Sequence, residues 1–385
     1  MLLEIYNAVT GVLFHLLEPS NLGITGVSIF TVYLSSLRAL EHERFIAETK
    51  DDSLQVTLSS LQAAIFPFVA SIFLIFMFYF FSSVSLIYIS MAVFTSWAAV
   101  AFAFAPLASV TPSWQALSGV SPVKHDSKVA AGNCRTQMVF GSKARTAALC
   151  SLSALPVIAW ALTGHWLLNN ILGCCLCATI ISFIRLPNMK ICTILLGCLL
   201  LYDVFWVFFS STLFGNNVML HVAQQKSSNP VHAAAKAMNL PVASGIAPKL
   251  DPPVKLMFPA SPLRSSTRAS YSALGLGDVA IPGMVLALAA CIDQKQSAAA
   301  PSSRPPRYLT AATAGYAAGM VAASAAAALT GDAQPALLYL VPAVLLPVFA
   351  VARRRGQLDL LWSGPRLLFP DRVTIKAADC GLLRT

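Results

Sequence analysis

Two aspartates stand out because each lies in a strongly apolar stretch. Asp203 interrupts the run LLLYDVFWVFFS, residues 199–210, and Asp278 closes the tetrapeptide GLGD at the head of a second apolar run. Even on the milder insertion scale, a carboxylate near the centre of a membrane helix costs about 2.5–3.5 kcal/mol. Two acids in such settings predict a function that needs them.

Two carboxyl groups in close contact at low dielectric cannot both ionise, so the pair holds one proton near neutral pH. The charged member can act as general base on a water molecule. The protonated member can hydrogen-bond a scissile carbonyl and then assist the leaving amine. This is aspartic protease chemistry, with Asp203 and Asp278 as the catalytic pair, and it calls for no cofactor and no metal. Water must reach the pair, so we expect a cavity that is not fully closed.

Other functions fit a pair of intramembrane acids as well. A proton-coupled transporter or channel could use Asp203 and Asp278 as a relay, and a membrane binding protein could carry them as vestiges. Other protease classes lack their motifs, because the sequence has no HExxH pair and no GxSG serine motif. Replacement of Asp203 by Asn separates the alternatives: a protease loses cleavage, a transporter loses proton-coupled flux, and a binding protein loses neither.

The composition predicts an all-α polytopic membrane protein. Hydrophobic residues form 57% of the chain and charged residues only 11%, against roughly 25% charged in ordinary soluble domains. The lipid bilayer is therefore the expected surrounding. The net charge of +10 does not indicate nucleic acid, because the basic residues are dispersed and form no stripe with aromatic residues. Most of the nine cysteines lie in apolar runs, so we expect neither a disulfide framework nor a zinc site.

About nine windows are apolar enough to cross roughly 30 Å of hydrocarbon as helices. An apolar lead-in at residues 2–17 precedes them and is interpreted as interfacial. The predicted division of the chain is residues 1–146 for the lead-in, the first three helices and a cytosolic loop; 147–352 for a protease core of six helices with a lumenal loop at 212–272; and 353–385 for a cytosolic tail. The windows are 22–40, 63–81, 84–107, 147–163, 166–184, 191–211, 273–292, 309–329 and 335–351.

The distribution of basic residues predicts the orientation. With the N-terminus lumenal and the C-terminus cytosolic, most of the 26 Lys and Arg residues fall on the cytosolic side. The others lie in the long lumenal loop, where the positive-inside rule is weak.

The two aspartates are expected to meet at equal depth. Asp203 precedes the polar end of its window at Ser210 and Ser211, and Asp278 follows Ser272, which opens the next window. At about 1.5 Å of rise per residue, both lie roughly 10 Å below the same membrane surface. A single loop joins their helices, which must therefore be antiparallel.

The residues around the aspartates support the pairing. Gly275 and Gly277 flank Leu276 and remove side chains before Asp278, and Pro282 weakens the following helix. Tyr202 stands beside Asp203 as positional support. In the last window, backbone groups near a helix-start proline can be left free to meet an extended peptide. That segment is Gln334, Pro335, Ala336 and Leu337.

Two further patterns concern helix packing. Gly315 and Gly319, in an alanine-rich window, would let two helices approach closely. Asn169 and Asn170 could contribute to a polar pocket, but interhelical hydrogen bonds are the favoured expectation.

Three motifs in this order, YD within LLLYDVFWVFF, GLGD followed by VAIPG, and QPALLYLVP, resemble those of the signal peptide peptidase family, relatives of presenilin. GHWLLNNILG, IRLPNMKI and SNPVHAAAKAMNLP are similar to its plant and algal signal peptide peptidase-like branch. The resemblance implies a presenilin-type bundle of nine helices in which Asp203 and Asp278 are catalytic and the PAL residues border the active site.

The same resemblance implies substrates and a compartment. The expected substrates are membrane-spanning peptides, either type II membrane proteins or leftover signal peptides. The plant branch favours endosomal membranes, with the endoplasmic reticulum as the alternative, and the lumenal N-terminus agrees with signal peptide peptidases and not with presenilin. A homo-oligomer is left open.

Overall fold

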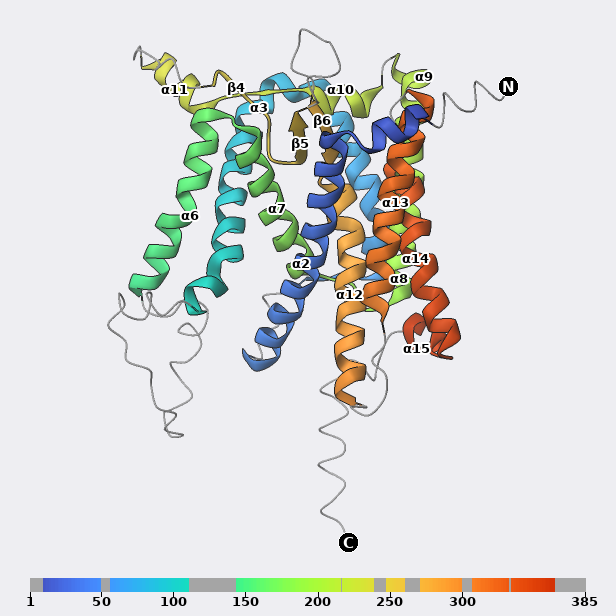
Figure 1. Ribbon diagram of the computed structural model, residues 1–385. Helices are drawn as coiled ribbons and strands as arrows, with labels where there is room; N and C mark the ends of the chain where they lie inside the picture. The colour runs from blue at the N-terminus through green and yellow to red at the C-terminus, as the bar shows by residue number, and fades with distance from the viewer. Residues whose placement is uncertain are drawn as a thin grey trace.

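The computed structural model is mostly helical (Figure 1). Within the described residues, seven helices are long and apolar enough to cross a membrane, and the shorter apolar helix Ala147–Thr163 accompanies them. The all-α architecture expected from the composition is therefore confirmed. The structure describes residues 10–49, 56–110, 143–215, 217–238, 247–259, 271–299, 307–331 and 334–363.

The first four predicted windows lie in three helices. The first is in α2 (Pro19–Thr49), the second and third share α3 (Ser60–Val110), and the fourth is in α6 (Lys143–Thr163). The predicted break in α3 is wrong, because Ser82 and Ser83 remain helical. A straight helix of 51 residues would be about 77 Å long, and Figure 1 shows that α3 instead rises, bends and descends. One continuous helix thus accounts for two predicted spans.

The other predicted windows each correspond to one span. The span Met189–Phe214 is built from three consecutive elements: α8 (Met189–Val204), the π-helix η2 (Phe205–Phe209) and α9 (Ser210–Phe214). The remaining spans are α7 (Trp166–Phe183), α12 (Gly277–Ala299), α13 (Tyr308–Thr330) and α14 (Ala336–Arg354), and a short helix, α15 (Leu358–Ser363), follows the last.

Short helices and strands from the predicted long loop gather at one end of the bundle, uppermost in Figure 1, which we call the sheet end. The opposite end, where α15 lies, is the far end. The elements at the sheet end are α10 (Val218–Gln224), α11 (Pro230–Ala237), the antiparallel pair β3 (Ser227–Ser228) and β4 (Lys249–Leu250), and the antiparallel pair β5 (Lys255–Pro259) and β6 (Tyr271–Gly275). A parallel pair, β1 (Val56–Thr57) and β2 (Ile184–Arg185), completes the strands.

The β5–β6 hairpin corrects one prediction. The window predicted to begin as a helix at residue 273 begins as strand β6, which pairs with β5. Backbone pairing with β5, in which Met257 is opposite Ala273, satisfies groups that a helix would otherwise pair. Helix α12 starts only at Gly277.

Helix α12 is the centre of the bundle. It contacts α2, α7, α8, α13 and α14, and 67% of its apolar window is buried, more than in any other described span. A helix that is apolar on all sides, as this one is over most of its length, belongs in such a position.

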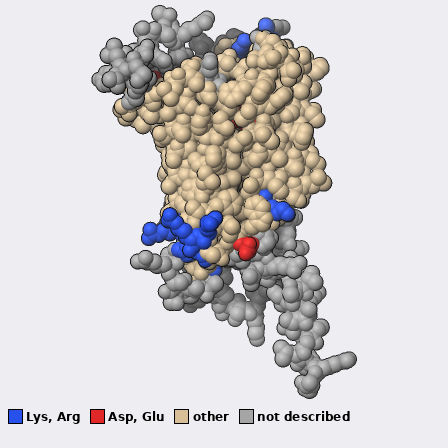
Figure 2. Space-filling model, turned by 90° about the vertical axis from the view of Figure 1, so that its right-hand side faces the viewer, with Lys and Arg blue, Asp and Glu red and all other residues tan. Residues whose placement is uncertain are grey.

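Helices α13 and α14 pack closely, as the glycine spacing predicted. A Cβ added at Gly315 would collide with the backbone oxygen of Ala343, and one at Gly319 would lie 3.0 Å from the Ala343 Cβ. The face in Figure 2 shows a broad band without charged side chains, with Lys and Arg gathered mainly at the far end. Both features suit a bundle that spans a bilayer.

Four predicted segments lie partly outside the described residues. They are the first part of the lead-in (residues 1–9), most of the predicted cytosolic loop (111–142), parts of the predicted lumenal loop (216, 239–246 and 260–270) and most of the tail (364–385). Residues 10–16 of the lead-in are helical.

Candidate active site

Helix α8 carries Asp203 into the interior near its last turn. The helix is fixed at its start by Asn188, whose side chain accepts a hydrogen bond from the Ile191 N–H at 2.9 Å. Its buried face includes Leu195, Leu196 and Leu199. Asp203 follows on the same side, with 3% of its surface exposed. The apolar run that made this acid unusual thus buries it.

A π-helix begins two residues after Asp203. Its buried residue Trp206 donates from Nε1 to the Ser71 hydroxyl of α3 at 3.1 Å. Single π turns occur often at functional sites, and this one widens the helix beside the acid. Tyr202 is half-buried, its ring centroid lies 6.4 Å from that of Trp206, and it interacts electrostatically with the Asp203 carboxylate.

The GLGD segment joins β6 to α12: Gly275 ends the strand, Leu276 forms the turn, and Gly277 begins the helix. Leu276 donates its N–H to the Val254 oxygen at 3.0 Å, and its own oxygen accepts the Ala280 N–H at 2.8 Å, which starts α12. The Leu276 side chain packs on α7, where a Cβ at Gly173 would lie 3.3 Å from its Cδ1. Leu276 therefore anchors the turn, and Asp278 lies in the first turn of the helix.

The two glycines leave one side of Asp278 open. Gly275 and Gly277 are both exposed, and Asp278 itself is partly exposed. A Cβ at Gly275 would lie 3.4 Å from Asp278 Oδ2, so any side chain there would contact the carboxyl group. The open side is consistent with the expected access of water.

The structure brings the two acids together. Helices α8 and α12 are in contact, and the Asp203 carboxylate interacts electrostatically with Asp278. Within the described residues neither acid forms an ion pair with Lys, Arg or His. Nor is any group of three or more His, Cys, Asp or Glu side chains in that part of the chain placed to hold a metal ion.

The predicted QPAL segment divides into two roles. Pro335 is the N-cap of α14, and the Leu337 N–H in the first turn donates to Asp203 Oδ2 at 3.0 Å. First-turn N–H groups have no partner within their own helix, which leaves this one available; Ala336 precedes it as the first helical residue. Gln334 does not reach the aspartates: its Nε2 donates to the Thr330 hydroxyl of α13 at 3.0 Å.

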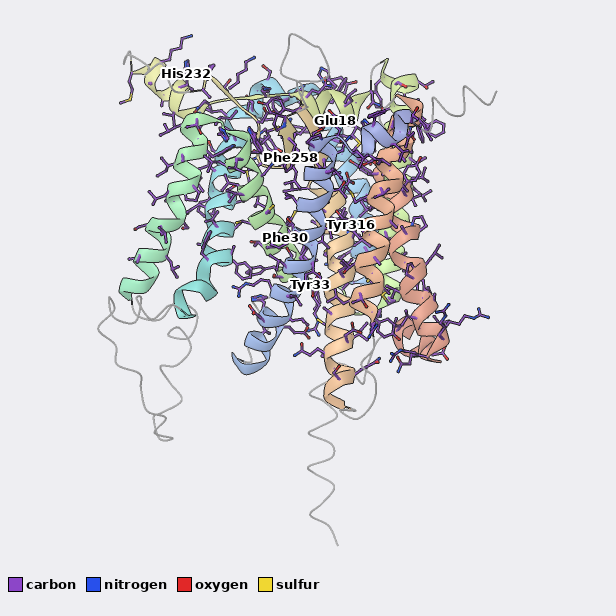
Figure 3. The ribbon with its side chains drawn as sticks, in the orientation of Figure 1. Glu18, Phe30, Tyr33, His232, Phe258 and Tyr316 are labelled. Atoms are coloured by element: carbon purple, nitrogen blue, oxygen red, sulfur yellow. The ribbon has the colours of Figure 1, made fainter. Side chains whose placement is uncertain are left out.

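The hairpin beside GLGD is held by α2 and α7. Phe258 of β5, labelled in Figure 3, packs where a Cβ at Gly23 of α2 would be only 2.8 Å from its ring. Asn170 of α7 accepts the Met257 N–H and donates to the Met257 oxygen, both at 2.8 Å. Asn169 donates to the Lys255 oxygen, also at 2.8 Å. The expected interhelical bonds of the two asparagines are thus wrong, since both bind strand β5.

Another contact at the site had no signal in the sequence. Tyr316 of α13 is fully buried, and its hydroxyl donates to the main-chain oxygen of Asp278 at 3.3 Å. Only its position as a large aromatic residue in an alanine-rich helix could have drawn attention to it.

Chemically, two acids close enough to affect each other's ionisation favour a state with one proton for the pair, and the exposed glycines leave a side open to water. The N–H that Asp203 accepts from Leu337 favours its charged form, whereas its burial opposes that form. Asp278 faces the opening left by the glycines.

The chain is similar to known proteins over most of its length. The family model described as "Signal peptide peptidase" matches residues 49–367. A protein of Oryza sativa subsp. japonica named "Signal peptide peptidase-like 1" is 41% identical over 377 residues, covering 94% of this chain and 97% of the relative. The Arabidopsis thaliana protein of the same name is 40% identical, covering 93% and 96%. The human "Signal peptide peptidase-like 2A" is 32% identical over 58% of this chain and 40% of its own length.

Proposed function

Because this chain belongs to the signal peptide peptidase family of intramembrane aspartic proteases, we propose that Asp203 and Asp278 are its catalytic pair. The observation that carries this proposal is the meeting of the two acids between α8 and α12 with no cation beside them among the described residues. Family membership also favours hydrolysis over the proton relay considered from the sequence.

In the proposed mechanism Asp203 is the base. The Leu337 N–H stabilises its charged form, so Asp203 takes a proton from water as the water oxygen attacks the carbonyl carbon of the substrate. Asp278 donates its proton to the carbonyl oxygen and forms the tetrahedral intermediate. Collapse of this intermediate breaks the C–N bond. One of its two hydroxyl groups returns a proton to Asp278 and becomes the carbonyl of the new carboxyl group, while the leaving amine takes the proton from Asp203.

The substrate must be extended when it is cleaved, because a transmembrane helix has its peptide groups engaged in internal hydrogen bonds. Strand β6 ends at Gly275, the first residue of GLGD, and pairs on one side with β5. Among the described strands no other pairs with β6. The free edge of β6 can pair with an unwound segment of substrate, and such pairing would lead the peptide to Asp278.

The proposed orientation places the sheet end in the lumen and the far end in the cytosol. Exposed Arg353, Arg354 and Arg355 at the end of α14 support this placement under the positive-inside rule. We propose type II membrane proteins or signal-peptide remnants as substrates and endosomal membranes as the compartment, with the endoplasmic reticulum as the alternative. Residues 147–352, which contain both acids, form the proposed protease core.

The test uses the purified full-length protein and a type II membrane reporter in liposomes. Wild type cleaves the reporter, and Asp203→Ala and Asp278→Ala each reduce the rate about a thousandfold or more. Asp293→Asn, which removes another acid of α12, is the matched control and keeps cleavage per folded molecule. Full activity in either alanine variant would contradict the proposed pair.

A further inference from the structure

A buried tyrosine on a neighbouring helix reaches the turn that carries Asp278. Tyr316 of α13 has no exposed surface, and its hydroxyl donates to the Asp278 main-chain oxygen at 3.3 Å. In Figure 3 the label of Tyr316 lies where α13 passes α12. The contact is made with the backbone of Asp278 and not with its carboxyl group.

The backbone oxygen of Asp278 needs this donor because of Pro282. In an α-helix the oxygen of residue i accepts the N–H of residue i+4, and for Asp278 that residue is Pro282, which has no N–H. A buried carbonyl left without a donor is unfavourable. The hydroxyl of Tyr316 replaces the helical hydrogen bond that the proline removes.

The position of Tyr316 is fixed by its surroundings. The adjacent residue, Gly315, lies against the Ala343 backbone of α14 so closely that no side chain would fit there. Ser28 of α2 also hydrogen-bonds the tyrosine hydroxyl, while its own hydroxyl donates to the Thr25 oxygen at 2.9 Å. The tyrosine hydroxyl thus lies between a serine of α2 and the main-chain oxygen of Asp278.

We infer that Tyr316 is a positioning residue, which holds the first turn of α12 so that the Asp278 carboxyl group faces Asp203. The inference rests on the proposed catalytic role of Asp278. Under this inference Pro282 and Tyr316 act on the same group. The proline leaves the main-chain carbonyl of Asp278 without a helical donor, and the tyrosine of α13 hydrogen-bonds that carbonyl.

The first experiment compares two buried tyrosines of α13. Tyr316→Phe keeps the ring and removes the hydroxyl, and we expect kcat to fall about three- to tenfold with KM unchanged, as for one lost neutral hydrogen bond. The matched control is Tyr308→Phe, since Tyr308 is equally buried and its hydroxyl donates to Gln357 Oε1 at 2.8 Å, away from the acids. Equal kcat in both variants, corrected for folded protein, would show a purely structural role and overturn the inference.

The second experiment restores the missing donor. Pro282→Ala places an N–H within the helix where it can bond the Asp278 oxygen, so adding Tyr316→Phe in that background should lower kcat less than twofold. A loss of the same size in both backgrounds would overturn the inference, because the tyrosine would then act by another route.

A double-mutant cycle tests this contact without an activity assay. It compares the thermal midpoints of wild type, Tyr316→Phe, Pro282→Ala and the double variant. If wild type fails to cleave, the proposed function fails, but coupling in this cycle still decides whether the hydroxyl and Pro282 act on one carbonyl. If Asp278→Ala abolishes cleavage and Tyr316→Phe does not affect it, the proposed function stands and the inference fails.

Discussion

Two groups of acids lie near opposite ends of helix α12, and they differ in the cations and hydrogen-bond donors around them. At the far end, Glu43 of α2 accepts from Arg185 Nη2 at 2.8 Å, from Lys295 Nζ at 3.2 Å and from the Cys291 thiol at 2.7 Å. At the start of α12, Asp278 meets a second acid, and Asp203 receives a single N–H from Leu337. One group is neutralised by cations, and the other is not.

Asp293 resembles Glu43, because its carboxylate also has several partners. Its carboxylate accepts the N–H of Tyr308 at 3.0 Å and that of Leu309 at 2.9 Å, and so it caps the start of α13. Acids with a structural task in this bundle have cations or several donors around them. The two acids of the site have neither, and acids left in that condition are candidates for chemistry.

The largest expected effect is a difference in stability between a variant of each group. Glu43→Gln removes the carboxylate that both Arg185 and Lys295 bind in a partly buried setting, and we expect a loss of about 2–4 kcal/mol in the free energy of unfolding. Asp278→Asn removes a carboxyl group that has no cation partner, so we expect no loss or a small gain. Thermal midpoints in detergent micelles measure both.

Arg185→Gln is the control for the Glu43 prediction, because it removes one cation partner of Glu43 and keeps the other, Lys295. The loss of unfolding free energy should be smaller for Arg185→Gln than for Glu43→Gln. If Asp278→Asn destabilises the protein as much as Glu43→Gln, the two ends of α12 do not differ as described.

The next effect concerns the single donor to Asp203. Leu337→Pro removes the N–H at a first-turn position where a helix tolerates proline, and we expect cleavage to fall about tenfold, as for a hydrogen bond to a charged group. Leu337→Ala keeps the N–H and loses the same buried side chain. The ratio of the two cleavage rates isolates the hydrogen bond, and a ratio near one would mean that Asp203 does not depend on it.

The cap at α13 should matter less. Asp293→Asn keeps one acceptor oxygen but loses the charge that faces two N–H groups, so we expect about 1 kcal/mol of lost stability. Cleavage per folded molecule should stay unchanged. Chemical denaturation followed by a cleavage assay on the folded fraction measures the two quantities separately.

The smallest effect is expected at the sheet end, outside the spans. Burial alone would raise the pKa of the Asp251 carboxyl, but Lys255 at 2.9 Å and Lys226 at 3.0 Å hold this pKa below its usual value. Its stabilising contribution is thus fully present above the unfolded-state pKa, near 3.9, and is lost as the pH falls through the lower folded-state pKa. Because these ion pairs are partly exposed, we expect them to contribute about 0.5 kcal/mol or less to the free energy of unfolding.

Thermal midpoints of wild type and Asp251→Asn, measured from about pH 6 down to pH 3, check the sign. The difference between the two proteins should shrink as the pH falls below about 4. A difference that grows towards acid would mean that the two lysines do not control this acid.

The sequence was sufficient for the residues whose types are unusual in their setting. Asp203 and Asp278 lie on contacting helices as expected, because an acid in an apolar helix is a local signal. The free N–H after the helix-start proline was also a local signal, but it was expected to meet an extended peptide, and in the structure the Leu337 N–H binds Asp203. Strand β6 was not predicted, because the apolar residues at 273–274 suit a strand or a helix, and only pairing with β5 decides between them. The bonds of Asn170 to β5 and of Tyr316 to Asp278 depend on packing between distant segments, which no local pattern records.

The π-helix η2 sets how the span around Asp203 can change in length. A π turn contains one residue more than the α-helical turn it replaces, since its hydrogen bonds join residues five apart and not four. A deletion within Phe205–Phe209 can therefore be absorbed by return to a plain α-helix. A deletion between Asn188 and Asp203 would turn the acid about 100° away from the Leu337 N–H. During evolution, η2 is thus the part of this span most tolerant of a lost codon, and α8 is the part least tolerant of it.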